Sequence, residues 1–148
     1  WGKPKNWYGR GNREWSVTAD ASAPLASWNR YTAPTDTLDF AKWQRGSRVP
    51  GTSYAAAVKV IAEGHRQAFL WVGARGKVVA ELNGEAVMTE ENLTRYRIGQ
   101  FQKLVELRSG ENLLVFRLQA ETISPQLSVL LVRPRNDGDT VDGIRWIA

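Results

Sequence analysis

The sequence predicts an all-β domain, either a sandwich or a barrel, for two reasons. About eight or nine short segments are apolar or alternate apolar with polar residues, and turn residues separate them about every 8 to 12 positions. In addition, no stretch shows the apolar spacing of a long amphipathic helix. The 148 residues suit one domain, with an irregular N-terminal segment (1–50), core strands (52–133) and a C-terminal tail (134–148).

The clearest strand signals surround the dipeptide Asn83-Gly84. Residues 68–72 form a short apolar run, and the glycines that follow it favour a strand over a buried helix. Residues 78–82 alternate, so their apolar side chains can share one face of a strand. Asn-Gly supplies both positive-φ positions of a type I′ turn, which predicts a hairpin between 78–82 and a strand at 86–88.

Three further segments before this hairpin carry strand patterns. Residues 14–19 alternate and make a plausible first strand, whereas 38–43 is either a strand or a single helical turn. Residues 52–61 place apolar side chains on one face, although their three consecutive alanines would also suit a helix. A short turn then leads to 68–72, so we expect these two strands to form an antiparallel pair.

After the hairpin, the polar residues 89–94 predict a loop or a short helical turn. Further strands are expected at 101–107, 113–119 and 127–132, the last strong strand pattern, and a turn at 136–140 precedes residues 144–147 of the tail. Residues 108–112 contain Ser, Gly and Asn, and we expect them to form a hairpin loop of four or five residues.

The composition excludes several classes of protein. The net charge is +5 and the pI is about 9.8, but the 20 cationic residues are scattered singly among 15 acids, which argues against nucleic-acid binding. No apolar run is long enough to span a membrane. The absence of cysteine excludes disulfides, thiolate metal sites and cysteine nucleophiles. Because the chain begins at Trp1, we expect a processed protein or an excised module.

Two turn motifs and the strands around them form a recognisable pattern. Asn83-Gly84 ends one alternating strand, and Gly110-Glu111-Asn112 precedes another. Together with Trp71-Val72-Gly73 and residues 127–132, these motifs resemble galactose-binding-like jelly-roll domains, the accessory β-sandwiches of glycoside hydrolases and other large bacterial cell-surface proteins. The resemblance covers about residues 54–133 and implies an antiparallel β-sandwich of jelly-roll topology.

The resemblance also implies a function. It favours a non-catalytic carbohydrate-binding module of a secreted, periplasmic or cell-surface protein. The alternative is a structural domain that uses the same scaffold to pack against another domain or subunit. Catalysis is not expected, because the single histidine, His65, lies in a turn and the acids lie in polar loops.

Aromatic residues in loop-like sequence are the candidate ligand contacts. A sugar ring presents an apolar C–H face that packs on an indole or phenol, while Arg and Asn donate hydrogen bonds to its hydroxyls. Trp15 and Trp71 lie within strand patterns and are assigned to the core. The candidate ligand-binding residues are Trp7, Tyr8, Arg10, Trp28, Asn29, Tyr31 and Trp43.

Domains of the resembled kind often carry a structural calcium ion, for which oxygen ligands are required. Asp137, Asp139 and Asp142 near the C-terminus are the candidate ligands, and Asp36 with Asp39 is a second pair. The triplet Asn92-Leu93-Thr94 matches the pattern of an N-glycosylation acceptor, which matters only for a protein of eukaryotic secretory origin.

Overall fold

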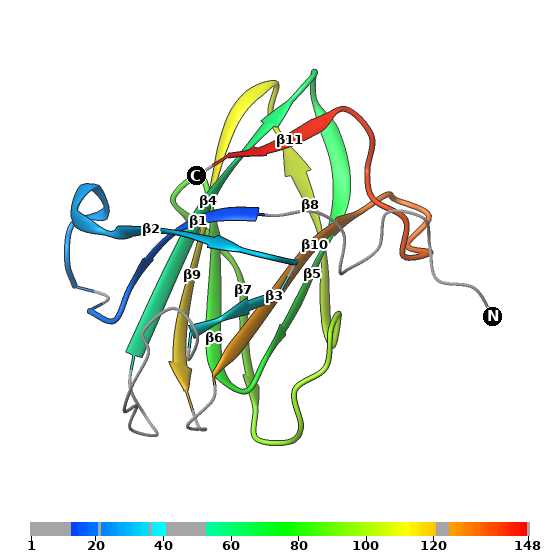
Figure 1. Ribbon diagram of the computed structural model, residues 1–148. Coiled ribbons are helices and arrows are strands. Elements are labelled where there is room, and N and C mark those ends of the chain that lie inside the picture. Colours follow the sequence, from blue (N-terminus) through cyan, green and yellow to red (C-terminus); the bar gives the residue numbers. More distant parts are fainter. Residues whose placement is uncertain (1–12, 21, 36, 41–52, 121–124, 148) are drawn as a thin grey trace.

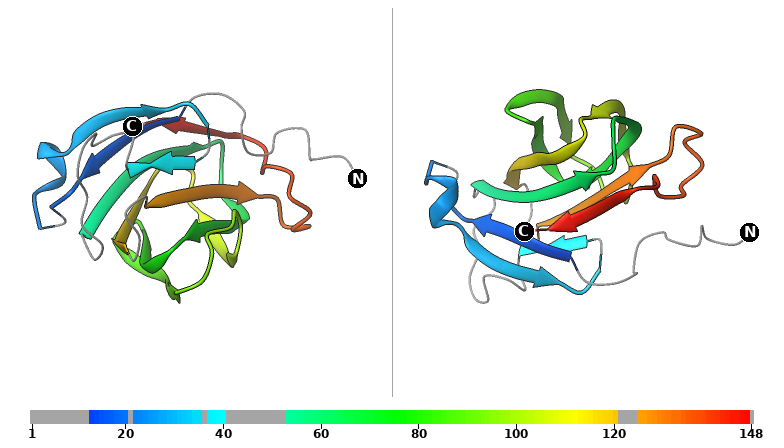
Figure 2. Two further views of the ribbon diagram at one scale, coloured as in Figure 1. Left: turned by 60° about the horizontal axis from the view of Figure 1, so that its bottom comes forward. Right: turned by 90° about the horizontal axis from the view of Figure 1, so that it is seen from above.

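The computed structural model describes residues 13–20, 22–35, 37–40, 53–120 and 125–147, which form two antiparallel sheets packed face to face (Figures 1 and 2). Among these residues, no helix has the length and hydropathy of a membrane span. One short 3₁₀ helix, η1 (Leu25–Ser27), lies between the first two strands. The strands are β1 (Arg13–Thr18), β2 (Asn29–Ala33), β3 (Thr37–Asp39), β4 (Ser53–Ala62), β5 (Arg66–Ala74), β6 (Gly76–Leu82), β7 (Glu85–Asn92), β8 (Phe101–Leu107), β9 (Gly110–Ala120), β10 (Gln126–Val132) and β11 (Ile144–Ile147).

The two sheets differ in size. The larger has the order β2-β1-β4-β9-β6-β7, and β11 also pairs with β4, beyond the end of β1. The smaller has the order β3-β10-β5-β8. The connections β4–β5, β5–β6, β7–β8, β8–β9 and β9–β10 each pass from one sheet to the other. These crossings between layers are those of a jelly roll, so the predicted β-sandwich is confirmed.

The core lies between the sheets and follows the alternation seen in the sequence. In β6, Val78, Ala80 and Leu82 are buried, whereas Val79 and Glu81 between them are half-buried. Trp15 of β1 is fully buried and packs edge-on against Phe116 of β9, with ring centroids 6.1 Å apart. The assignment of Trp15 to the core is therefore confirmed, whereas Trp71 is only half-buried.

The predicted hairpin is present. Asn83 and Gly84 have φ angles of 53° and 85°, as a type I′ turn requires, and they join β6 to β7. The prediction of a loop or helical turn at 89–94 is wrong, because β7 continues to Asn92. Glu91 lies opposite Lys77 in this ladder, and such cross-strand pairing outweighs the low strand propensity of glutamate.

Two predicted pairings are wrong. β4 pairs with β9 rather than β5, and β8 pairs with β5 rather than β9. The turn residues between β4 and β5 and between β8 and β9 do reverse the chain. Each reversal, however, leads to a strand of the other sheet and not to a neighbouring strand of the same sheet. Turn chemistry is local and does not specify which sheet the next strand joins. At 38–43 the strand alternative is correct for β3, and residues 41–43 lie outside the described residues.

A buried amide joins the two turn motifs that carry the resemblance. The Asn112 side chain is fully buried, and its Oδ1 accepts a hydrogen bond from Asn83 Nδ2 at 3.0 Å. Its Nδ2 donates to the carbonyl oxygens of Arg108 at 2.9 Å, Gly110 at 3.1 Å and Val60 at 3.3 Å. Asn112 thus ties the β6–β7 hairpin to the turn between β8 and β9.

Asn92, the asparagine of the predicted sequon, has a structural role. Its side chain is buried, and Nδ2 donates to the carbonyl oxygen of Ala74 at 2.9 Å. Its Oδ1 accepts hydrogen bonds from the backbone N–H and the hydroxyl of Thr94, at 2.9 and 2.6 Å. In the folded protein this amide is therefore committed to holding the end of β7 against β5.

Gly73 of β5 permits the loop before β8 to approach the smaller sheet. A Cβ at this position would lie 2.1 Å from the carbonyl oxygen of Arg97, so Gly73→Ala must displace backbone. We expect the variant to lose about 3 kcal/mol of unfolding free energy in urea denaturation, at the upper end of overpacking. Gly84→Ala is the control, because its Cβ would meet nothing within 4 Å and only its φ of 85° is unfavourable. It should lose about 1 kcal/mol. Equal losses would contradict the steric explanation.

Candidate ligand-binding site

A small pocket opens on the outer face of the larger sheet. It has a volume of about 200 Å³ and combines an apolar floor with an aromatic wall and a polar rim. Its lining residues come from β1, β2, β4, β9 and the η1 region: Ser16, Leu25, Ala26, Trp28, Arg30, Ala57, Val58, Lys59 and Leu113.

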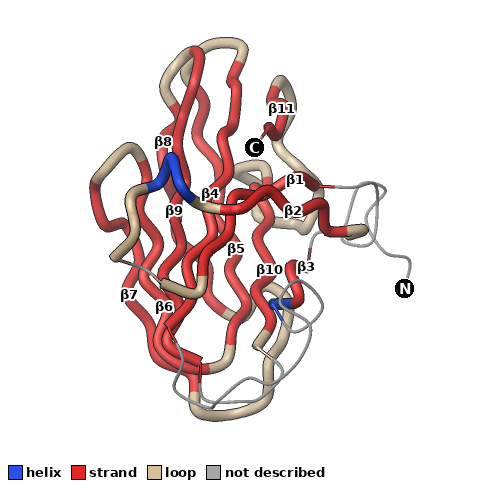
Figure 3. The backbone as a smooth tube through the Cα atoms, turned by 60° about the vertical axis from the view of Figure 1, so that its left-hand side comes forward, coloured by secondary structure: helices blue, strands red, loops and turns tan. Residues whose placement is uncertain are grey.

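Trp28 forms the aromatic wall because the chain around η1 folds back over the sheet, as Figure 3 shows. The indole packs against Ala55 and Ala57 of β4 and Val115 of β9. Alanine at both β4 positions leaves room for the indole to lie close to the sheet. The indole N–H donates to the carbonyl oxygen of Ala23 at 2.9 Å, which holds the ring in place. Trp28 is 9% exposed, so it presents only part of its surface to the pocket.

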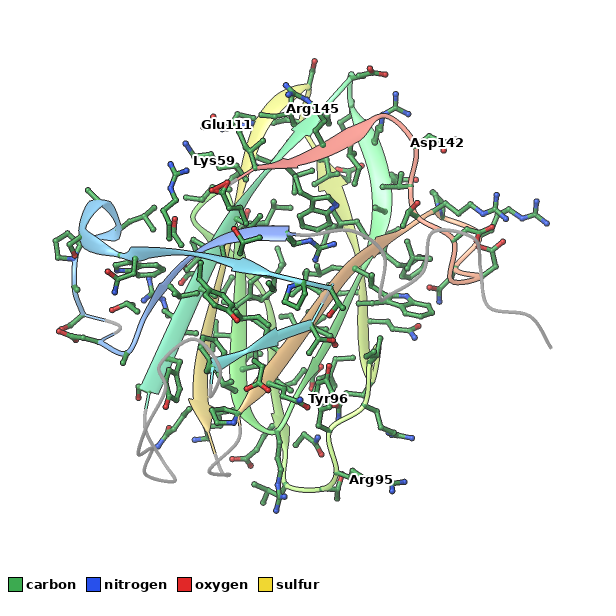
Figure 4. All side chains as sticks on the ribbon, in the orientation of Figure 1. Lys59, Arg95, Tyr96, Glu111, Asp142 and Arg145 are labelled. Carbon is green, nitrogen blue, oxygen red and sulfur yellow. The ribbon has the colours of Figure 1, made fainter. Side chains whose placement is uncertain are left out.

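Ser16 and two cations supply the polar rim. The Arg30 guanidinium lies 3.4 Å from a carboxylate oxygen of Glu14, and the Lys59 ammonium lies 3.8 Å from a carboxylate oxygen of Glu111. Figure 4 shows Lys59 and Glu111 close together near β11. These exposed ion pairs contribute little to stability, so the two cations can exchange their carboxylate partners for a ligand at small cost.

The structure separates the predicted ligand-binding residues. Trp28 lines the pocket, but alternation along β2 turns Tyr31 toward the opposite side of the sheet, where it packs against the main core. Asn29 is exposed and does not line the pocket. The remaining candidates, Trp7, Tyr8, Arg10 and Trp43, lie outside the described residues and stay predictions.

Sequence reasoning missed the rim cation of β2, Arg30, because it treated 29–33 as a loop. The available signal was the alternation of residues 29–33, in which Tyr31 and Ala33 share one face. Arg30 then lies on the opposite, outer face of the strand. Lys59 lies in the alternating segment 52–61 that was predicted as a strand, and its side chain is on the outward face of β4. Nothing local to either residue indicates that the two lie beside one pocket.

The candidate calcium ligands have a different partner. Arg133 forms ion pairs with both Asp137 and Asp139, the second at 3.1 Å. The hydrogen bond from Arg133 lowers the pKa of Asp137 to about 2. Among the described residues, no group of three or more His, Cys, Asp or Glu side chains is placed to hold a metal ion. Arg133 thus pairs with two of the three candidate calcium ligands, and the assignment of Asp137, Asp139 and Asp142 to a calcium site stays a prediction.

A larger, open groove lies between the edge strands β7 and β8. Its volume is about 660 Å³. Polar side chains such as Lys103 and Glu106 line it together with aliphatic ones, including the exposed Leu104. None of the described residues that line it is aromatic, so these residues offer no flat apolar surface to a sugar ring.

Comparison with solved structures supports the fold. The chain matches a β-glucosidase from Kluyveromyces marxianus with a TM-score of 0.56 and 6% identity over 84% of this chain and 17% of that one. This likeness shows the fold alone, an antiparallel β-sandwich as predicted. The same enzyme in complex with glucose gives 0.53 at 7% identity, with the same two coverages. The chain thus spans 17% of the length of these β-glucosidase chains.

A family 35 carbohydrate-binding module from Clostridium thermocellum is also similar. It is 12% identical over 86% of this chain and 95% of that one, with a TM-score of 0.43. No protein-family model matches the sequence, and no curated protein matches it either.

Proposed function

We propose that this domain is a non-catalytic carbohydrate-binding module of a secreted or cell-surface protein, and that the pocket beside Trp28 holds a sugar. The observation that carries the proposal is a pocket whose lining combines the indole of Trp28 and aliphatic side chains with the polar side chains of Ser16, Arg30 and Lys59. A sugar is apolar on the face of its ring and polar at its edge, and this pocket offers a matching surface for each.

The pocket is preferred over the larger groove for a chemical reason. Hydrogen bonds to hydroxyls largely replace hydrogen bonds to water, so they contribute little net affinity by themselves. Packing of the C–H face on an aromatic ring removes apolar surface from water, and this burial adds net affinity. Trp28 supplies that surface in the pocket, whereas the lining of the groove has none.

Affinity electrophoresis tests this proposal. The purified domain would be run through gels containing β-glucan, xylan, galactomannan, pullulan or alginate, and we expect at least one of them to retard it. Lys59→Ala, which changes only the exposed rim, should weaken that binding about 5-fold, and Trp28→Ala should weaken it at least about 10-fold. Because Trp28 also packs on the sheet, circular dichroism must show that Trp28→Ala remains folded.

Lys103→Ala is the matched control, since this lysine lies in the groove between β7 and β8. Its binding should equal that of the unchanged protein. Loss of binding in Lys103→Ala but not in Lys59→Ala would place the site in the groove. No retardation by any polysaccharide, together with self-association in solution, would favour the structural domain. Release of reducing sugar from a bound polysaccharide would contradict the non-catalytic assignment.

A further inference from the structure

A second cavity lies on the same face of the larger sheet as the Trp28 pocket. Its volume is about 210 Å³, and its lining includes Ser53 of β4, Val79 of β6 and Gln119 of β9. We infer that the two cavities are parts of one elongated site, which binds a linear glycan chain along β4 and β9 instead of a single sugar. This inference rests on the proposed function.

The register of β4 and β9 places the two cavities in line. Lys59 pairs with Leu113 beside the first cavity, and Ser53 pairs with Gln119 beside the second. Alternate residues of a strand share a face, so Ser53 and Lys59, six residues apart, point outward together. At about 3.3 Å per residue, this spacing corresponds to about 20 Å along the strand. That length is suited to several linked sugars and exceeds a single ring.

Trp28 lies between the two ends of this line. It packs on Ala55 and Ala57, the outward residues of β4 that separate Ser53 from Lys59. A chain running along the strands would therefore meet the indole near its middle. Ala55 and Ala57 are themselves buried beneath the indole, so the chain would meet Trp28 there and not the surface of the sheet.

The second cavity has an apolar patch and a polar edge like the first, but Tyr54 in its lining is buried, so the indole of Trp28 is the aromatic surface of the elongated site. Val79 provides an apolar patch, and the exposed side chains of Lys77 and Gln119 provide hydrogen-bond donors at its edge. Arg117 also lines this cavity, but its guanidinium is ion-paired with Glu81 at 3.5 Å, so Lys77 and Gln119 are the donors assigned to the ligand. The cavity is thus a second sugar-binding position rather than a purely apolar gap.

Calorimetry with oligosaccharides of increasing length, prepared from the polysaccharide that retards the domain, tests this inference. We expect affinity to rise with length over several sugars. The double variant Lys77→Ala/Gln119→Ala should weaken binding of the longest fragment about 10-fold and leave the shortest bound fragment unaffected. Lys59→Ala should weaken both. Both substituted residues of the double variant are exposed, so folding should be unchanged.

The outcomes separate this inference from the function on which it rests. If affinity is already maximal with the shortest bound fragment, or if the double variant binds the longest fragment normally, the elongated site is wrong and the single-sugar pocket stands. If none of the polysaccharides retards the domain, both proposals fail. Lys103→Ala, in the separate groove, should bind fragments of every length normally.

Discussion

Asn112→Ala is expected to lower the unfolding free energy by about 3 kcal/mol, among the largest effects of any single substitution in this domain. The side chain is fully buried and makes hydrogen bonds with Asn83, Arg108, Gly110 and Val60. Alanine would leave the buried carbonyl oxygen of Val60 without this donor and would remove the hydrogen bonds to the three more exposed partners. An unsatisfied buried group costs about 1–3 kcal/mol. Urea denaturation monitored by tryptophan fluorescence would measure the loss.

A double-mutant cycle with Asn83 isolates the bond between the two turns. Asn83→Gly retains the positive φ of 53° while removing the amide, so its effect reports mainly the lost hydrogen bonds. We expect a coupling energy of about 1 kcal/mol between Asn83 and Asn112. Strictly additive effects would show that the two motifs are neighbours without being energetically joined.

Arg13→Met is expected to cost about 2 kcal/mol, the second large effect. Arg13 is only 6% exposed, and its guanidinium carbon lies 3.7 Å from the ring centroid of Trp146 in β11. It also donates to the backbone carbonyl of Val129 in β10. Methionine keeps much of the apolar contact, but it removes the cation that lies over the indole ring. It also leaves the carbonyl oxygen of Val129 without the hydrogen bond that Arg13 donates.

Arg145→Met is the matched control, since Arg145 is exposed on β11 beside Trp146 (Figure 4). It should change stability by less than about 0.5 kcal/mol. Arg13→Lys should also lose stability, because an ammonium lacks the planar geometry of the guanidinium on an aromatic ring. Thermal denaturation of the three variants would check this order. A negligible loss in Arg13→Met would show that burial of the aliphatic part of the Arg13 side chain, and not its charge, stabilises the contact between β1 and β11.

The predictions that held were those set by the local geometry of the backbone. Alternation with a period of two located β6 and its buried face, and Asn83-Gly84 specified a hairpin because few other residues adopt its two positive φ angles. β7 was predicted too short, since its glutamates are poor strand formers. Their place in the strand depends on the partner strand, which the local pattern does not include.

The Trp28 pocket shows what the sequence left open. Trp28 was identified as a candidate from its chemistry alone, while Tyr31, chosen for the same reason, packs against the core. Arg30 and Lys59 line the same pocket because β1 pairs with both β2 and β4, an arrangement that no local pattern specifies.

The sequence by itself determined most of the strands, with β2 as an exception, the buried face of the alternating ones and the position of the tight hairpin. Only the tertiary structure decided the sheet that each strand joins, and hence that β4 pairs with β9 and not with β5. The physical reason is that pleating and turn geometry act between neighbouring residues, whereas the choice of sheet depends on burial between segments far apart in the chain.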